Sequence, residues 1–194
     1  MKSKCKLIYP MVAMLFVGCA SFSLNTAQSP KVLNVHENVY GVSVLPVPKT
    51  FYDTTLSAKS LTYELFGRFG QFEKVDFGLK MGLFASMFPY FYLDGKYQFI
   101  SDPIFSSLIL GVSFAPNFGI VVYTLHSTLL FGKDYLYAGA KFNYNNFLGP
   151  FPGAVLGCQI GPKQIKILPE LNIYWYQSMV MYVPSLSFRL NLSK

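Results

Sequence analysis

The sequence predicts an all-β fold: a transmembrane, up-and-down antiparallel β-barrel of eight to ten strands, with ten as the best count. Residues 61–99 alternate apolar and polar side chains through three successive segments, which is the period of strands with one apolar and one polar face. Only 13% of residues are charged and 18% are aromatic, whereas about 25% of a soluble domain is charged. Beyond the N-terminus there is no uncharged apolar run of the roughly 18 residues that a membrane helix needs.

Residues 1–18 have the pattern of an export signal, with lysines at positions 2, 4 and 6 followed by an apolar stretch and small residues. The stretch Phe16-Val17-Gly18-Cys19 resembles the lipobox of bacterial lipoproteins, although Phe16 stands where leucine is usual. The resemblance implies that Cys19 is diacylated and becomes the mature N-terminus. An ordinary secretory signal, cleaved near Ala20 or Ala27, is the alternative.

The next segment, residues 19–36, is rich in Ser, Asn, Gln and Pro and has no periodicity, so we expect the acylated cysteine followed by a flexible tether. Residues 37–194 are expected to form the barrel. Removal of the three signal lysines leaves 13 basic and 9 acidic residues, a formal charge of +4. The basic residues are spread singly, which argues against nucleic-acid binding, because such sites need a concentrated basic surface.

The barrel region divides into ten alternating segments of about the length that crosses a bilayer at a tilt. These are residues 37–45, 60–70, 73–85, 90–100, 105–115, 119–131, 134–144, 153–161, 164–176 and 181–192. The connections after the second, fourth, sixth and eighth segments are short, while those at 46–59 and 145–152 are longer. An even strand count places both barrel termini on one side, which we expect to be the periplasm, with a lipid on Cys19 in the inner leaflet.

Charged residues recur in the polar phase and are mixed in sign, so we expect them inside the barrel as a largely self-neutralising network. The predicted members are Glu64, Arg68, Asp76, Lys80, Asp94, Lys96, Lys141, Glu170 and Arg189, with Lys74 also in the polar phase. Leu65, Phe77, Leu79 and Leu93 occupy the other phase and are expected to meet lipid. Interfacial aromatic girdles are expected from Tyr40, Tyr63, Tyr90, Tyr97, Tyr144, Trp175 and Tyr182.

The segments 67–70 (Gly-Arg-Phe-Gly), 75–80 (Val-Asp-Phe-Gly-Leu-Lys) and 93–98 (Leu-Asp-Gly-Lys-Tyr-Gln) resemble uncharacterised outer-membrane β-barrel lipoproteins of Gram-negative-type bacteria. The resemblance implies a lipid-anchored protein of the cell outer membrane. Its implied partners are outer-membrane lipid and the barrel-assembly and lipoprotein-sorting machineries. It supplies no catalytic residues and names no extracellular partner.

Three functions fit the sequence. The leading one is a structural, surface-interaction or narrow-channel role without catalytic residues, cofactor or metal. The second is a soluble, lipid-anchored, lipocalin-like barrel that binds an apolar ligand inside. The third is a lipid-modifying enzyme, in which His126 would act as a base and Thr128 would share its face, although no acid partner is identifiable.

Overall fold

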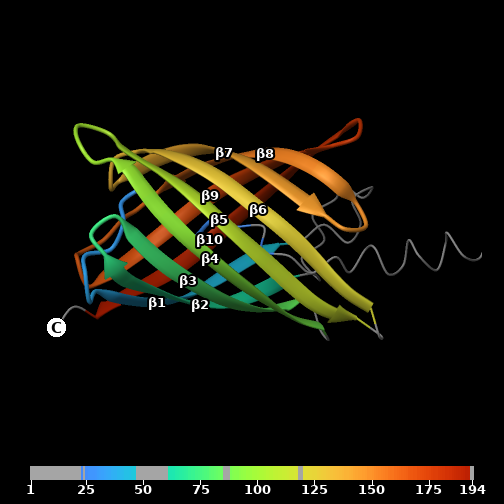
Figure 1. Ribbon diagram of the computed structural model, residues 1–194, viewed down its shortest axis with the longest axis horizontal. Helices are drawn as coiled ribbons and strands as arrows, with labels where there is room; N and C mark the ends of the chain where they lie inside the picture. Colours follow the sequence, from blue (N-terminus) through green and yellow to red (C-terminus); the bar gives the residue numbers. More distant parts are fainter. Residues whose placement is uncertain (1–22, 24, 47–60, 85–87, 118–119, 193–194) are drawn as a thin grey trace, which may run out of the picture.

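The chain forms one closed barrel of ten antiparallel strands (Figure 1). The computed structural model describes residues 23, 25–46, 61–84, 88–117 and 120–192. Its strands are β1 (Asn38–Pro46), β2 (Leu61–Phe72), β3 (Val75–Phe84), β4 (Phe88–Ile100), β5 (Phe105–Asn117), β6 (Ile120–Gly132), β7 (Leu136–Asn145), β8 (Gly149–Cys158), β9 (Ile165–Tyr176) and β10 (Met179–Leu192). Each pairs with its neighbour in the sequence, and β1 pairs with β10 to close the sheet. The predicted up-and-down antiparallel barrel of ten strands is confirmed.

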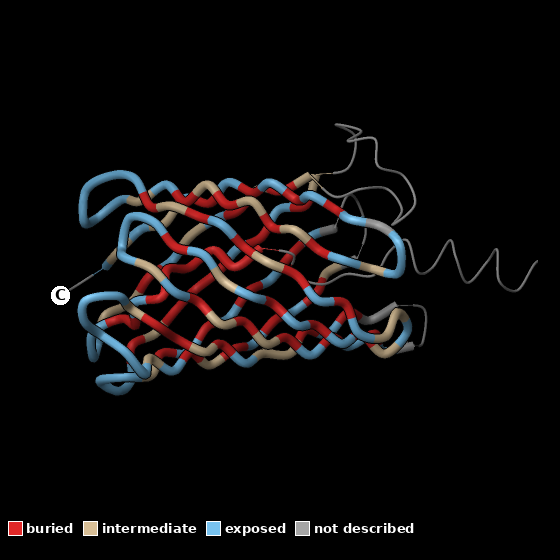
Figure 2. Tube along the Cα trace, turned by 90° about the horizontal axis from the view of Figure 1, so that it is seen from above, coloured by how far each residue is buried: buried red, intermediate tan, exposed pale blue. Residues whose placement is uncertain are grey.

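The strands form where apolar and polar residues alternate, because a closed sheet has one inner and one outer face. Burial changes from residue to residue along each strand (Figure 2). In β7, for example, Tyr137, Lys141 and Asn143 are buried, while Leu136 and Phe142 are exposed. The polar phase therefore faces the lumen and the apolar phase faces outward, as the sequence predicts.

The two ends of the barrel differ. We call the end where β1 begins and β10 finishes the terminal end, because Asn38 of β1 lies opposite Leu192 of β10 there. We call the opposite end the distal end. The distal end carries the longest connection, residues 47–60, which lie outside the described residues. The other distal connections span no more than three residues each, so loop length distinguishes the two ends at this connection alone.

Strand β8 begins earlier than the sequence predicts, at Gly149 rather than residue 153, so the connection expected at 145–152 shrinks to 146–148. Pro150 and Pro152 suggest a loop because they lack the backbone donor of a sheet ladder. They are tolerated here because β8 pairs with β9 only over residues 153–157 of the described chain, which leaves both prolines outside that ladder.

The N-terminal segment differs from the tether predicted over residues 19–36. Ser23 and residues 25–30, 32 and 33 are buried inside the barrel, and Ala27 and Leu33 pack against Val39 and Phe66 in one apolar cluster. A polar, aperiodic sequence is typical of a linker, but it also suits an extended chain surrounded by polar side chains. The predicted signal peptide and Cys19 lie outside the described residues.

Glycines on the inner face make room for large side chains from neighbouring strands. Gly82 of β3 lies in register between Glu64 of β2 and Tyr90 of β4. A Cβ atom at Gly82 would lie 2.1 Å from the Tyr90 ring. The tyrosine therefore lies across the glycine and donates a hydrogen bond to Glu64. Gly157 does the same for Tyr137, whose ring atoms would lie 2.5 Å from an added Cβ.

We predict that Gly82→Ala destabilises the barrel by about 1–3 kcal/mol, because the new methyl group must displace a fully enclosed ring. The control is Gly95→Ala, where the nearest atom to an added Cβ is 3.6 Å away, so its effect stays within about 0.5 kcal/mol. Urea unfolding in detergent, followed by Trp175 fluorescence, measures both. Equal stabilities of the two variants would contradict the packing role of Gly82.

Candidate functional site

The lumen is occupied by the chain's own N-terminal segment, and charged side chains of the barrel bind its backbone. Glu170 of β9 accepts hydrogen bonds from the backbone N–H groups of Thr26 and Ala27, at 2.9 and 3.0 Å. Lys80 of β3 donates to the carbonyl oxygens of Asn25 and Thr26, at 3.0 and 3.1 Å. A carboxylate and an ammonium group thus fill the places that a neighbouring strand would take in a sheet.

The same pattern continues toward the terminal end. Lys96 donates to the carbonyl oxygens of Ser29 and Lys31, at 3.2 and 2.7 Å. Asp76 Oδ2 accepts from the N–H group of Leu33 at 3.0 Å, and Gln98 Oε1 accepts from that of Val32 at 2.8 Å. Side chains from β3, β4 and β9 therefore hold the segment along its length.

These contacts fix the direction in which the segment runs. Leu33 lies beside Asp76, the second residue of β3 at the terminal end, and the segment then enters β1. Ser23 accepts a hydrogen bond from Lys80, four residues further along β3 toward the distal end. From Leu33 back to Ser23, the chain therefore runs through the lumen from the terminal end toward the distal end.

A compact cluster of four charges lies in the wall behind the segment. Arg68 binds Asp76 through Nε, at 3.0 Å, and through Nη2, and it binds Asp94 through Nη1 at 2.7 Å. Lys96 Nζ lies 3.1 Å from Asp76. Arg68, Gly78 and Asp94 lie in one register row, and the missing side chain at Gly78 lets Arg68 reach across β3. The two positive and two negative charges neutralise one another.

Other buried charges find neutral partners. Tyr137 donates to Glu170 at 2.5 Å, which completes the environment of the carboxylate that holds the segment. Lys141 donates to Asn172 Oδ1 at 2.6 Å and to the hydroxyl of Tyr174 at 3.2 Å. Hydrogen bonds of this kind offset the large cost of removing charge from water.

The structure places all nine predicted network residues on the lumen face, but it does not form one network of them. Arg68, Asp76, Asp94 and Lys96 bind one another directly. Outside this cluster, Lys80 and Glu170 are linked through Thr26, Glu64 binds Tyr90, Lys141 binds Asn172, and Arg189 lines the cavity at the end of the barrel. Lys74 is exposed in the β2–β3 turn and takes no part. Tyr90, expected in an interfacial girdle, is fully buried in the lumen.

Sequence reasoning missed Lys166, which also faces the lumen and completes the set of charged residues in the strands. Its signal was present, because Lys166 shares the phase of Glu170, four residues later on β9. Sequence reasoning also missed that the backbone of residues 25–33 is the main partner of Lys80 and Glu170. The alternation of apolar and polar residues carries no signal for such a contact.

His126 faces the lumen beside Thr128, and both side chains are buried. Its Nε2 lies 3.0 Å from the hydroxyl of Ser113, and its Nδ1 lies 2.9 Å from Asn143 Oδ1. Both of these hydrogen-bond partners of the imidazole are neutral. A cavity of only about 10 Å³ remains between these residues and the N-terminal segment.

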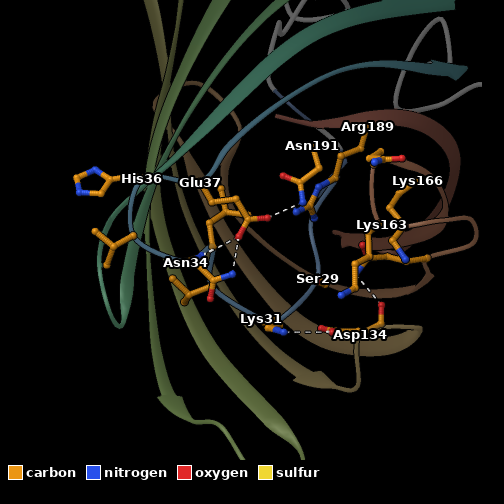
Figure 3. Close-up of a pocket in the computed structure, with 15 residues that line it drawn as sticks. Ser29, Lys31, Asn34, His36, Glu37, Asp134, Lys163, Lys166, Arg189 and Asn191 are labelled. Carbon is orange, nitrogen blue, oxygen red and sulfur yellow. Dashed lines mark hydrogen bonds and ion pairs between the residues drawn. The ribbon is translucent and has the colours of Figure 1, made fainter. Parts of the chain in front are cut away.

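A larger cavity of about 620 Å³ opens at the terminal end, between the N-terminal segment and strands β9 and β10 (Figure 3). We call it the vestibule. Lys163, Lys166 and Arg189 lie on one side of it, and Asn34 and Glu37 lie on the other. Among the described residues, no group of three or more His, Cys, Asp or Glu side chains is arranged to hold a metal ion.

We predict that Arg68→Gln destabilises the barrel by about 3–5 kcal/mol, because Asp76 and Asp94 lose a buried partner. Adding Asp94→Asn recovers part of the loss by removing one unpaired charge. Guanidinium unfolding in detergent measures these values.

The matched control is Lys31→Gln, which breaks an exposed pair at 3.6 Å to Asp134 and costs less than about 1 kcal/mol. Equal losses in the two variants would show that burial gives the Arg68 cluster no special weight.

No protein-family model and no curated protein sequence matches the chain. Among solved structures it is similar to a de novo designed transmembrane β-barrel, with 10% identity over 84% of this chain and 100% of that chain and a TM-score of 0.42. The N-terminal β-barrel domain of Pseudomonas aeruginosa OprF has 10% identity over 82% and 100%, with a TM-score of 0.42. The designed barrel TMB2.3 has 14% identity over 82% and 96%, with a TM-score of 0.41.

Proposed function

We propose that this protein is an outer-membrane β-barrel whose lumen is closed by its own N-terminal segment, and that it serves a structural or surface-interaction role rather than that of an open pore. The main observation in support of this proposal is the distribution of charged side chains between the two faces of the barrel. Every charged side chain within the ten described strands faces the lumen, and none faces outward. A soluble barrel would present its charges to water on the outside.

The outer face supports contact with lipid. Every strand carries at least one large apolar side chain exposed on this face: Val42, Leu65, Leu79, Leu93, Leu110, Leu125, Phe142, Leu156, Ile167 and Phe188. Exposed aromatic residues lie toward both ends, with Tyr40 and Tyr97 near the terminal end and Tyr63, Tyr144, Trp175 and Tyr182 near the distal end. This is the arrangement of an apolar band between two aromatic girdles.

The filled lumen supports a closed barrel over the narrow-channel role. The N-terminal segment lies along the axis, and about 10 Å³ is left beside it near His126. A single water molecule needs roughly this much space. The vestibule is much larger, but it lies at the terminal end, and the N-terminal segment forms part of its wall.

The lipocalin-like alternative requires an apolar interior, and the described interior does not supply one. Its apolar clusters are small and separate, and the charges of Arg68, Lys80 and Glu170 lie between them. A lipid-modifying enzyme is a second proposal, and it rests on His126 and Thr128 lying next to each other on the lumen face. The hydrogen-bond partners of His126 are neutral, so no carboxylate of the described residues is bound to it to strengthen it as a base.

We further propose that the terminal end faces the periplasm and that Cys19 carries the lipid. The N-terminal segment runs up the lumen, so the anchor would lie at the distal end, in the outer leaflet. Cys19 is four positions before Ser23 in the sequence, a reach of at most about 14 Å. Four positions along β3 likewise lead from Lys80 to the last residue of the strand, Phe84. This proposal differs from the inner-leaflet position that the sequence leads us to expect.

We predict that Leu79→Cys and Leu93→Cys, each in a Cys158→Ser background, resist a water-soluble maleimide in proteoliposomes, because bilayer hydrocarbon excludes the reagent. Lys74→Cys in the β2–β3 turn is the control and reacts fully when the reagent is present on both sides of the membrane. Labelling at Leu79 and Leu93 as fast as at Lys74 would favour the soluble barrel.

We also predict that an epitope tag placed between residues 19 and 23 is accessible to antibody on intact cells. A tag between Pro46 and Leu61 behaves in the same way, because that connection lies at the distal end, while a C-terminal tag is protected until the outer membrane is opened. An N-terminal tag protected together with the C-terminal one would contradict the threaded topology.

A further inference from the structure

Two like charges face each other across strands in the wall of the vestibule. Arg189 of β10 is the register partner of Lys166 of β9, and both side chains face the lumen. On its other side, Arg189 is paired with Gly41 of β1, which has no side chain to offer. Directly opposed like charges destabilise a sheet. The arrangement is therefore costly unless negative charge lies between them.

The carboxylates of the vestibule are already engaged. Glu37 Oε1 accepts from Asn191 Nδ2 at 2.5 Å, and Glu37 Oε2 accepts from the backbone and side-chain nitrogens of Asn34, both at 2.9 Å. Asp134 pairs with Lys31 at 3.6 Å. Figure 3 shows Asn34 and Glu37 across the cavity from Lys163 and Lys166, whereas Asp134 lies on the same side as Lys163.

The basic side retains hydrogen-bonding capacity that the described chain leaves unused. Nε of Arg189 is buried without a hydrogen-bond acceptor, and Oδ1 of Asn191, two residues along the same face, is buried without a donor. Lys166 donates to the carbonyl oxygen of Gly161 at 2.9 Å, which is a neutral acceptor. Lys163 adds a further positive charge at the rim.

We propose that the vestibule binds a small, water-soluble organic anion that carries a phosphate or carboxylate group and a neighbouring hydroxyl. The anionic group interacts with Arg189, Lys166 and Lys163, since guanidinium groups bind carboxylate and phosphate through two parallel hydrogen bonds. The hydroxyl supplies the donor that Asn191 Oδ1 lacks. A volume of about 620 Å³ lies within the range of small-molecule sites.

Isothermal titration of the full-length protein in neutral detergent tests this site, with glycerol 3-phosphate as the probe. We expect saturable binding that weakens with added salt. Affinity falls at least tenfold in Arg189→Gln and in Lys166→Gln. Lys74→Gln, which removes an exposed lysine at the same end of the barrel but outside the vestibule, changes the affinity by less than twofold. Because binding is measured in detergent, the result is independent of whether the barrel spans a membrane in cells.

Heat-modifiable gel migration verifies that each variant is folded, and Lys166→Gln keeps the test decisive if Arg189→Gln does not fold. A second arm uses short-chain phosphatidylglycerol. Binding of this lipid without binding of glycerol 3-phosphate would identify a lipid headgroup as the source of the anion and overturn the water-soluble ligand. No saturable binding of either compound, or an equal loss in Lys74→Gln, would overturn the site itself.

Discussion

The structure depends on one constraint: the charged side chains inside the barrel must find partners without water around them. The wall satisfies this in part, through the cluster formed by Arg68, Asp76, Asp94 and Lys96. Tyr90 and Asn172 of the wall bind Glu64 and Lys141. The backbone of residues 25–33 provides N–H groups to Glu170 and carbonyl oxygens to Lys80. Without that segment, Glu170 and Lys80 would lose most of their hydrogen-bond partners, at a cost of several kcal/mol for each buried charge. The N-terminal segment is therefore a structural component of the barrel.

Packing inside so narrow a barrel depends on a second, geometric device. In several places, three residues lie in register on three neighbouring strands, and the middle one is a glycine. One example is Tyr137, Gly157 and Glu170, in which Tyr137 donates a hydrogen bond to Glu170 across the glycine. The glycine removes the middle side chain, so the outer two meet over it. The device explains why glycines recur in the polar phase of the strands. In the wall of the vestibule, Gly41 lies between Arg189 and Phe66, and the apolar ring of Phe66 covers the glycine.

Much of the fold could be predicted from period-2 alternation, because the two faces of a closed sheet differ so strongly in polarity. The strand count and the lumen-facing position of residues such as Arg68 and Glu170 follow from it. The lumen-filling segment could not be predicted, because an extended chain held by side chains from β3, β4 and β9 has no periodicity of its own. The start of β8 was obscured by Pro150 and Pro152, whose effect depends on which ladders they border. The sequence predicts Tyr90 in a girdle, yet it lies in the lumen, because aromatic residues occur both in membrane girdles and inside narrow barrels.

The central claim is that residues 25–33 lie inside the barrel and satisfy its buried charges. Residue-resolved amide hydrogen exchange in detergent tests it without altering the chain. The account predicts that the N–H groups of Thr26, Ala27 and Leu33, which donate to Glu170 and Asp76, exchange as slowly as those in the centre of β3. Exchange of these three amides at the rate of an unstructured peptide, with the strands still protected, would contradict it.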